Sequence, residues 1–204
     1  KPTLGRVPRY SGAAAPFVAN HLIQSGPMSR TVRDSALLLQ VMAGHDARDP
    51  GSLRTPPPDF LAAADRGVRG LRIAWSPDYG YAPVDPEVVD VTYRAARLFE
   101  EMGCTVEESE LALVDLFEPF MTLFAGYSYA ATGALLESHA DALTEYGRRS
   151  LQFGEKVTGA DYARALGYAE RLKGQFADQF DAYDLVLSPT VAVPPSPVDR
   201  RPDE

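Results

Sequence analysis

Apolar residues recur at helical spacing in SRTVRDSALLLQVMAGHD, the segment that runs from residue 29 to residue 46. The pattern predicts a helix with Thr31 as its N-cap, and Asp34 three residues later completes a capping box. Gly44 suits the left-handed backbone position that ends many helices. Because nearly all of ALLLQVMA is apolar, we expect this helix to be covered on more than one side.

The pattern then changes from helical spacing to alternation. In GLRIAWSPD (70–78), Leu71, Ile73 and Trp75 occupy alternate positions, which predicts a strand. A helix that starts with an Asp-Pro pair is predicted over 85–103, and CTVEESE (104–110) predicts a second strand. Strand, helix and strand in this short span form a βαβ unit, so we expect the two strands to be parallel.

The remainder of the pattern is mainly helical, from Leu113 to Tyr183. Its best-defined helix starts at Thr158, with Asp161 in the capping-box position. DLVLSPT (184–190) then predicts a short strand buried on both faces. The tail, residues 189–204, is too rich in proline for a central strand or a helix. These elements predict an α/β fold.

One uncharged stretch, PFMTLFAGYSYAATGALL (119–136), has roughly the length that a bilayer-spanning helix needs. A proline, two glycines and several hydroxyl side chains dilute its hydrophobicity. We therefore expect a buried helix that lines a core or a pocket, and no contact with a membrane.

Composition narrows the functional classes. The 204 residues include 20 basic and 28 acidic side chains, and the formal net charge of −8 disfavours direct binding of nucleic acid. Cys104 is the only cysteine, which is typical of a reducing compartment, and its apolar neighbours favour a packed, inert thiol. With His21, His45 and His139 scattered along the chain, we expect neither a zinc site nor a cofactor.

The residues alone reveal no catalytic apparatus. Phosphate-binding loops, HExxH pairs and GxSxG elbows are absent from the sequence. Nothing in the spacing brings a serine, a histidine and an aspartate together. Asp46 and Asp49 lie close to His45, but a solvated loop explains them better than a metal site. Serine and glycine are adjacent at Ser11-Gly12, Ser25-Gly26 and Gly51-Ser52, and each pair fits a simple turn.

Several segments in fixed order resemble the amidase signature family. KPTLGRVPRY resembles the family's Lys-Pro-Thr-x-Gly-Arg-Val-x-Arg segment. QSGPMSRTVRDSALLLQVMAGHDARDP resembles its Gly-Pro-Met-x-Arg-Thr-Val-x-Asp helix and the loop behind it, and this match is the most specific. GLRIAWSPD, FGEKVTGADYARAL and YDLVLSPT resemble later segments, so the resemblance covers essentially the whole chain.

The resemblance implies a mixed β-sheet flanked by helices and the hydrolysis of linear carboxylic amides by a Ser–Ser–Lys triad. The family's Gly-Gly-Ser-Ser-Gly-Gly-Ser run and its catalytic lysine have no match here, and in relatives they lie upstream of the segment that matches Lys1. We therefore expect residues 1–204 to be an internal portion of an amidase domain. The catalytic residues should precede Lys1, and this chain alone should be inactive.

The same resemblance suggests which residues form the wall of the substrate pocket. An arginine that pairs with a substrate carboxylate matches Arg149, or its neighbour Arg148. Phe124 and Tyr127 match a region that lines the acyl pocket, and Gln24 lies near the expected active-site side. Thr190 follows the last strand at its carboxyl end, where ligands of α/β proteins bind.

Three interpretations of the function stay open at this point. The first is a free-standing amidase that acts on a small-molecule amide in the cytoplasm, with a homodimer as one possible assembly. The second is an amidotransferase subunit that releases ammonia from glutamine, although the family's Asp-Gln-x-Gly-Pro appears here as Ile-Gln-Ser-Gly-Pro. The third is a non-catalytic binding module with the same fold.

Overall fold

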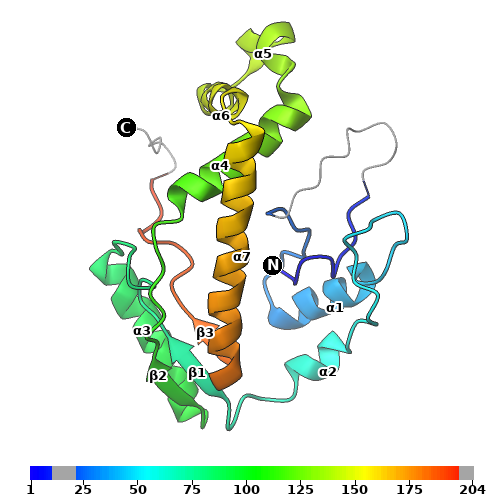
Figure 1. The fold of residues 1–204 in the computed structure, drawn as a ribbon. Helices are drawn as coiled ribbons and strands as arrows, with labels where there is room; N and C mark the ends of the chain where they lie inside the picture. The colour runs from blue at the N-terminus through cyan, green and yellow to red at the C-terminus, as the bar shows by residue number, and fades with distance from the viewer. Residues whose placement is uncertain (11–21, 198–204) are drawn as a thin grey trace. The chain divides into compact units, whose positions relative to one another are not determined.

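The computed structural model describes residues 1–10 and 22–197 (Figure 1), so Ser11-Gly12 and His21 lie outside the described residues. The chain divides into two compact units. One contains Lys1–Gly67 and Phe124–Val157, and the other contains Val68–Leu123 and the chain from Thr158 onward. The helices are α1 (Val32–Met42), α2 (Phe60–Ala64), α3 (Pro86–Glu101), α4 (Phe117–Thr132), α5 (Leu135–Ser138), the 3₁₀ helix η1 (Ala140–Ala142), α6 (Glu145–Glu155) and α7 (Gly159–Ala182). The strands are β1 (Arg72–Trp75), β2 (Thr105–Glu108) and β3 (Leu185–Leu187).

Helix α1 has the predicted N-cap, but the return hydrogen bond from the Thr31 N–H to the Asp34 side chain that would complete the capping box is absent from the described contacts, and the helix ends differently. The Thr31 hydroxyl accepts a hydrogen bond from the Asp34 N–H at 3.1 Å, which confirms the N-cap. At the other end, Ala43 is extended, and Gly44 does not take the predicted left-handed conformation. The Gly44 N–H instead donates to the Arg6 carbonyl at 3.2 Å. A partner from the preceding segment thus replaces the local hydrogen bonds that a left-handed glycine would make.

The prediction that α1 is covered on more than one side is wrong within the described residues. Ala36 is the buried residue of the helix, whereas Val32 and Val41 are 77% and 79% exposed. One side of α1 meets α2, where the Gln40 side-chain oxygen accepts the Phe60 N–H at 2.9 Å. Helix α2 covers one side of α1 only, so apolar side chains on the other sides of α1 stay exposed in the described structure.

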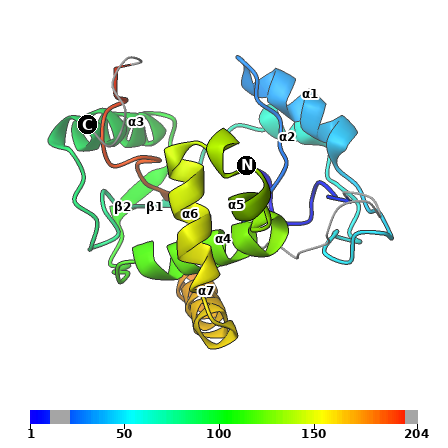
Figure 2. The ribbon, with the colours of Figure 1, turned by 90° about the horizontal axis from the view of Figure 1, so that it is seen from above.

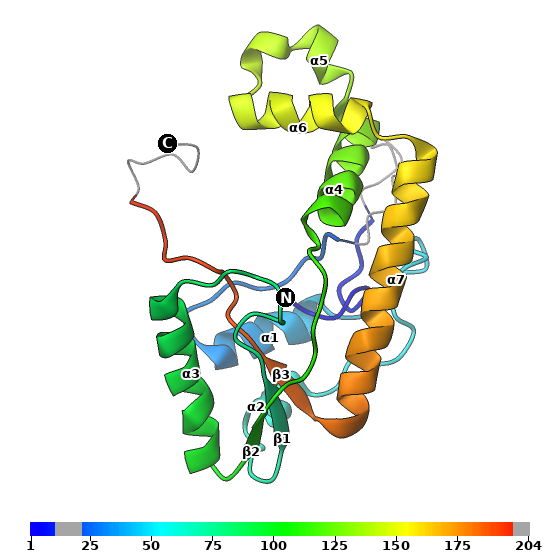
Figure 3. The same ribbon diagram turned by 60° about the vertical axis from the view of Figure 1, so that its left-hand side comes forward.

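The sheet has the strand order β2-β1-β3, and both pairings are parallel, which confirms the βαβ unit and the α/β class. β1 lies in the centre, where Ile73 and Ala74 are fully buried and Trp75 is 7% exposed. Helices α3 and α7 flank the sheet on opposite sides (Figure 3). The Trp75 ring contacts Tyr93 of α3, and the Tyr79 ring contacts Phe176 of α7.

The last strand is less enclosed than its composition predicts. β3 pairs with β1 through Leu185, Val186 and Leu187, but Leu185 is 37% exposed and the other two are half-buried. The prediction that this strand is buried on both faces is therefore wrong, and the strand with that burial is β1. β3 is at the edge of the described sheet, so it has a neighbour on one side only.

The uncharged stretch forms most of α4 and continues into α5, as a helical interpretation requires. Thr122, Leu123 and Ala125 of α4 are buried, which agrees with a core helix. In the part of the chain that the structure describes, none of the helices is both long and apolar enough to span a bilayer.

Candidate functional site

A group of hydroxyl side chains lies where β1 and β3 end. The Ser76 N–H donates to the Leu187 carbonyl at 3.0 Å, which extends the strand pairing by one residue. The Ser76 hydroxyl, on a residue that is 2% exposed, accepts the Tyr79 N–H at 2.9 Å. The Tyr79 hydroxyl then donates to Ser188 Oγ at 2.8 Å. These three residues tie the exits of two parallel strands together at the sheet edge where α/β folds bind ligands.

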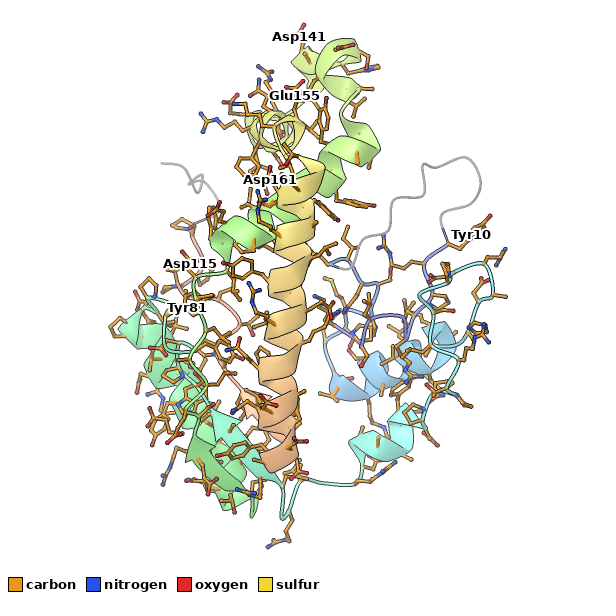
Figure 4. All side chains as sticks on the ribbon, viewed as in Figure 1. Tyr10, Tyr81, Asp115, Asp141, Glu155 and Asp161 are labelled. Carbon is orange, nitrogen blue, oxygen red and sulfur yellow. The ribbon has the colours of Figure 1, made fainter. Side chains whose placement is uncertain are left out.

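The turn that holds Tyr79 has an unusual backbone. Tyr79 has φ +52°, and no other non-glycine residue in the described ranges has a positive φ. Gly80 follows at φ +72°, and a Cβ on Gly80 would lie 3.0 Å from the Ala112 Cβ. Figure 4 labels Tyr81 just beyond this turn. Non-glycine residues held in this region are more frequent at functional sites than elsewhere.

Thr190 lies in the segment that leaves β3 along this edge. It is exposed, two residues after Ser188. The following residues are also held in place, because the Ala192 carbonyl accepts the Asp85 N–H at 2.8 Å. The position agrees with the expected carboxyl end of the strand, and the role of Thr190 in binding stays a prediction.

Helices α4 and α6 cross closely and carry the other predicted pocket residues (Figure 2). A Cβ on Gly154 of α6 would lie 2.7 Å from the Ala125 carbonyl carbon and 2.8 Å from the Tyr129 Cβ, both in α4. Phe124 and Tyr127 are three residues apart on α4, so they share one face of that helix. Both are half-buried, which suits pocket lining and core packing equally.

Two neighbouring arginines of α6 have very different surroundings. The Arg149 Nε donates to Glu145 Oε1 at 2.7 Å, one turn away, and the two side chains are 70% and 55% exposed. The Arg148 Nη2 donates to the Ala140 carbonyl at 3.0 Å. Its Nε is buried and has no hydrogen-bond partner among the described residues. Arg148 therefore has an unused buried donor, whereas Arg149 is engaged at the surface.

The loop after α1 brings a serine and a histidine together, which spacing alone did not predict. Ser52 Oγ lies 2.8 Å from His45 Nδ1, but it also accepts the Asp46 N–H at 3.1 Å and donates to the Asp46 carbonyl at 2.9 Å. Ser52 is 7% exposed. A hydroxyl that is buried and bonded in this way fixes the loop and is poorly placed to attack a substrate.

The carboxylate of this loop is also engaged. Both Asp46 oxygens bond the Arg48 side chain, at 2.9 and 2.6 Å, so Asp46 does not orient His45. The Arg48 guanidinium, together with the Arg48 backbone N–H, lowers the pKa of Asp46 to about 2. No group of three potential metal ligands occurs in the described ranges. The Asp46 carboxylate therefore serves to hold the loop through Arg48.

Two further sequence predictions concern single residues. Cys104 is 8% exposed and its thiol donates to the Val68 carbonyl at 3.0 Å, as expected of a packed thiol. Gln24 is half-buried in an irregular segment, and its proposed place near the active site stays a prediction.

Sequence reasoning missed Tyr79. The only signal for it was the Ser-Pro-Asp-Tyr-Gly run after the first strand, which marks a turn but does not show that a tyrosine occupies a left-handed position.

Comparison with known proteins places this fold in a family. The amidase family model matches residues 1–203. The chain is 37% identical over 215 residues to a glutamyl-tRNA(Gln) amidotransferase subunit from Rubrobacter xylanophilus, a match that covers 93% of this chain and 44% of that protein. It is 32% identical over 197 residues to an amidase of Pseudomonas putida, a match that covers 95% of this chain and 41% of that protein.

A solved structure agrees with these relatives. The structure of a bacterial aryl acylamidase of the amidase signature family matches with a TM-score of 0.84 at 30% identity, over 94% of this chain and 41% of that one. The chain thus spans less than half the length of these relatives. Since the family model covers residues 1–203 and a solved member shares the fold, this chain belongs to the amidase signature family.

Proposed function

We propose that this chain is part of an amidase that hydrolyses the C–N bond of a linear carboxylic amide. The match of the amidase family model over residues 1–203 carries the proposal. The relatives named amidase and acylamidase, from Pseudomonas putida and Rhodococcus erythropolis, support a small-molecule amide as the substrate.

We place the Ser–Ser–Lys triad outside these 204 residues, as an internal portion of an amidase domain would require. The lysines of the chain are Lys1, Lys156 and Lys173. A lysine that activates a serine must lie within hydrogen-bond reach of it. Lys173 pairs instead with Glu170 at 2.6 Å, and Lys156 is exposed at the end of α6. The positions of Lys156 and Lys173 support the proposal that the chain by itself has no amidase activity.

The role we assign to the chain is that of pocket wall. Phe124 and Tyr127 would contact the acyl group, and Thr190 would contact the substrate at the carboxyl edge of the sheet. For a substrate that carries a carboxylate, an arginine of α6 would pair with it. Arg149 is the sequence candidate, but the buried and unpartnered Nε of Arg148 makes Arg148 an equal one.

A second candidate function is glutamine hydrolysis as part of an amidotransferase. It is favoured by the 37% identity to the glutamyl-tRNA(Gln) amidotransferase subunit from Rubrobacter xylanophilus. In that case the chain would have protein partners and would pass ammonia to another enzyme. The chain has Ile23 where the amidotransferase segment has an aspartate, so this function is the second candidate.

One experiment separates these functions. The protein encoded by the complete gene is assayed with p-nitroacetanilide, with a panel of linear aliphatic amides, and with glutamine in the presence and absence of an amidotransferase partner. Hydrolysis of simple amides without a partner supports the amidase. Partner-dependent hydrolysis of glutamine alone supports the second function. No hydrolysis in any arm contradicts both and leaves a non-catalytic module.

The arginine candidates are tested with two substrates of equal length, one with a terminal carboxylate and one without. Arg148→Ala or Arg149→Ala should raise KM for the charged substrate by roughly 10- to 150-fold and leave KM for the neutral substrate unchanged, because a charge-assisted hydrogen bond contributes roughly 1.5–3 kcal/mol. Arg164→Ala is the control, because the Arg164 side chain on α7 is 69% exposed. If both α6 variants behave like the control, neither arginine binds the substrate.

We further propose that the protein is cytoplasmic. A single, buried cysteine is compatible with the reducing cytoplasm, where we place the protein. Gel filtration with light scattering of the complete gene product would distinguish a monomer from a homodimer, and fractionation of cells would test the location.

A further inference from the structure

Tyr79 contacts four separate segments at the carboxyl edge of the sheet. Its N–H bonds the Ser76 side chain at the end of β1, and its hydroxyl bonds Ser188 beyond β3. Its carbonyl accepts the Leu113 N–H at 2.8 Å, in the segment that follows β2. Its ring meets the Phe176 ring of α7 edge-to-face, with centroids 5.7 Å apart. The side chain therefore reaches β3 and α7, while the backbone holds the other two segments.

The backbone of Tyr79 is held in this place at a cost. A left-handed backbone conformation is disfavoured for a non-glycine residue because the Cβ crowds the following carbonyl oxygen. Gly80 beside it adopts the same region without that penalty. A glycine at 79 would preserve the backbone contacts to Ser76 and Leu113, but it would lose both side-chain contacts. The feature that requires a tyrosine is thus the reach of its ring and hydroxyl to Phe176 and Ser188.

The hydroxyl contact acts on the segment that leaves the sheet. Ser188 is the first residue after β3, and it opens the Ser188–Thr190 segment at the edge where ligands of parallel sheets bind. Pro189 restricts the backbone of Ser188, so an anchored Ser188 side chain also limits where Thr190 lies. We propose that Tyr79 is a positioning residue for the amide substrate, which acts by fixing Ser188–Thr190 through its hydrogen bond to Ser188. This inference rests on the proposed amidase function.

The proposal is tested in the protein encoded by the complete gene, with an amide that the wild-type protein hydrolyses. Tyr79→Phe keeps the ring contact with Phe176 and removes the hydroxyl, and Ser188→Ala removes the acceptor. Each variant should lower kcat/KM at 25 °C by about 3- to 10-fold, the effect of a hydrogen bond that contributes roughly 1 kcal/mol. The double variant should lose no more than the larger single loss, because both changes remove the same contact.

A matched control and a rescue separate positioning from stability. Tyr93 belongs to the same unit and is 45% exposed. Tyr93→Phe removes its hydroxyl and should leave kcat/KM unchanged. Ser188→Thr keeps an oxygen acceptor and should recover at least half of the lost kcat/KM. Melting curves confirm that each variant is folded at 25 °C, so a role in stability alone would lower Tm without changing kcat/KM.

The outcomes are distinct. Loss in Tyr79→Phe and Ser188→Ala, without further loss in the double variant and with recovery in Ser188→Thr, supports the inference. Wild-type kcat/KM in both single variants, or losses that multiply in the double variant, overturns it while the amidase function stands. Absence of any amide hydrolysis by the wild-type protein overturns the proposed function and this inference together.

Discussion

Gly154 of α6 and Ala125 of α4 lie so close that a methyl group on Gly154 would overlap the Ala125 carbonyl oxygen. Both residues are buried, and Ala125 is fully so. A backbone carbonyl within a helix cannot move aside as a flexible side chain can. The crossing of α6 over α4 (Figures 2 and 3) therefore depends on the absence of a side chain at position 154.

Gly154→Ala should lower the free energy of unfolding by about 1–3 kcal/mol, the usual cost of overpacking. Gly174→Ala is the matched control, because a Cβ on Gly174 in α7 meets nothing within 4 Å. There, the better helix propensity of alanine should raise stability by up to about 1 kcal/mol. Urea unfolding of the complete gene product measures both. Equal effects of the two substitutions would contradict the proposed dependence on Gly154.

Ser52→Ala should destabilise the loop after α1 and leave catalysis intact. The change leaves the Asp46 N–H and carbonyl without their shared partner, at a cost of roughly 1–3 kcal/mol. Ser138→Ala is the control. It also removes a contact between a serine and a histidine, but the Ser138–His139 contact lies at an exposed helix end. We expect a change within about 0.5 kcal/mol there. A loss of kcat in folded Ser52→Ala would show instead that Ser52 takes part in the reaction.

The pH dependence of stability should contain a contribution from Asp46 at acid pH. Arg48 lowers the Asp46 pKa from 3.8 to about 2 in the folded protein. A carboxyl with a lowered folded pKa stabilises the fold above its unfolded pKa, and this stabilisation is lost as the pH falls through the folded value. Asp46→Asn should therefore flatten the stability profile between about pH 4 and pH 2. Asp46 titrating near 3.8 by NMR would contradict the contact with Arg48.

Thr158→Ala should weaken the start of α7, where Asp161 marks the first turn (Figure 4). Thr158 and Asp161 form a complete capping box, with the Thr158 N–H and hydroxyl both donating to Asp161. We expect a loss of about 1 kcal/mol, while Thr158→Ser keeps most of the stability. Because the Thr158 hydroxyl is the main cause of the lowered Asp161 pKa, that pKa should rise in Thr158→Ala and stay low in Thr158→Ser.

Features that depend on a few neighbouring residues were predictable from the sequence. The caps at Thr31, Asp85 and Thr158 appear as expected, because a side chain bonds a backbone N–H two or three residues away. The βαβ unit follows from the same local patterns. The family was also accessible, since its motifs are continuous segments of the chain.

Features that depend on distant partners were not predictable. Gly44 misses the left-handed conformation because Arg6 supplies a hydrogen bond, and the Ser52–His45 contact requires a loop shape that no spacing specifies. The Tyr79–Ser188 bond joins residues 109 positions apart. Of the proposed pocket residues, the structure gives positions for Arg149, Tyr127, Phe124 and Thr190, and their contact with a substrate stays a prediction.

The central place of β1 has a consequence for the order in which the protein can fold during synthesis. One neighbour of β1, the strand β2, is made soon after it, since Arg72 contacts Glu107, 35 residues later. The other neighbour, β3, comes just after Asp184, which contacts Arg72 from 112 residues away. At a ribosomal rate of roughly 5–20 residues per second, β3 emerges on the order of 6–20 s after β1. During that interval the most buried strand of the finished sheet has an unpaired edge, and its free backbone groups can pair with another chain until Leu185 is made.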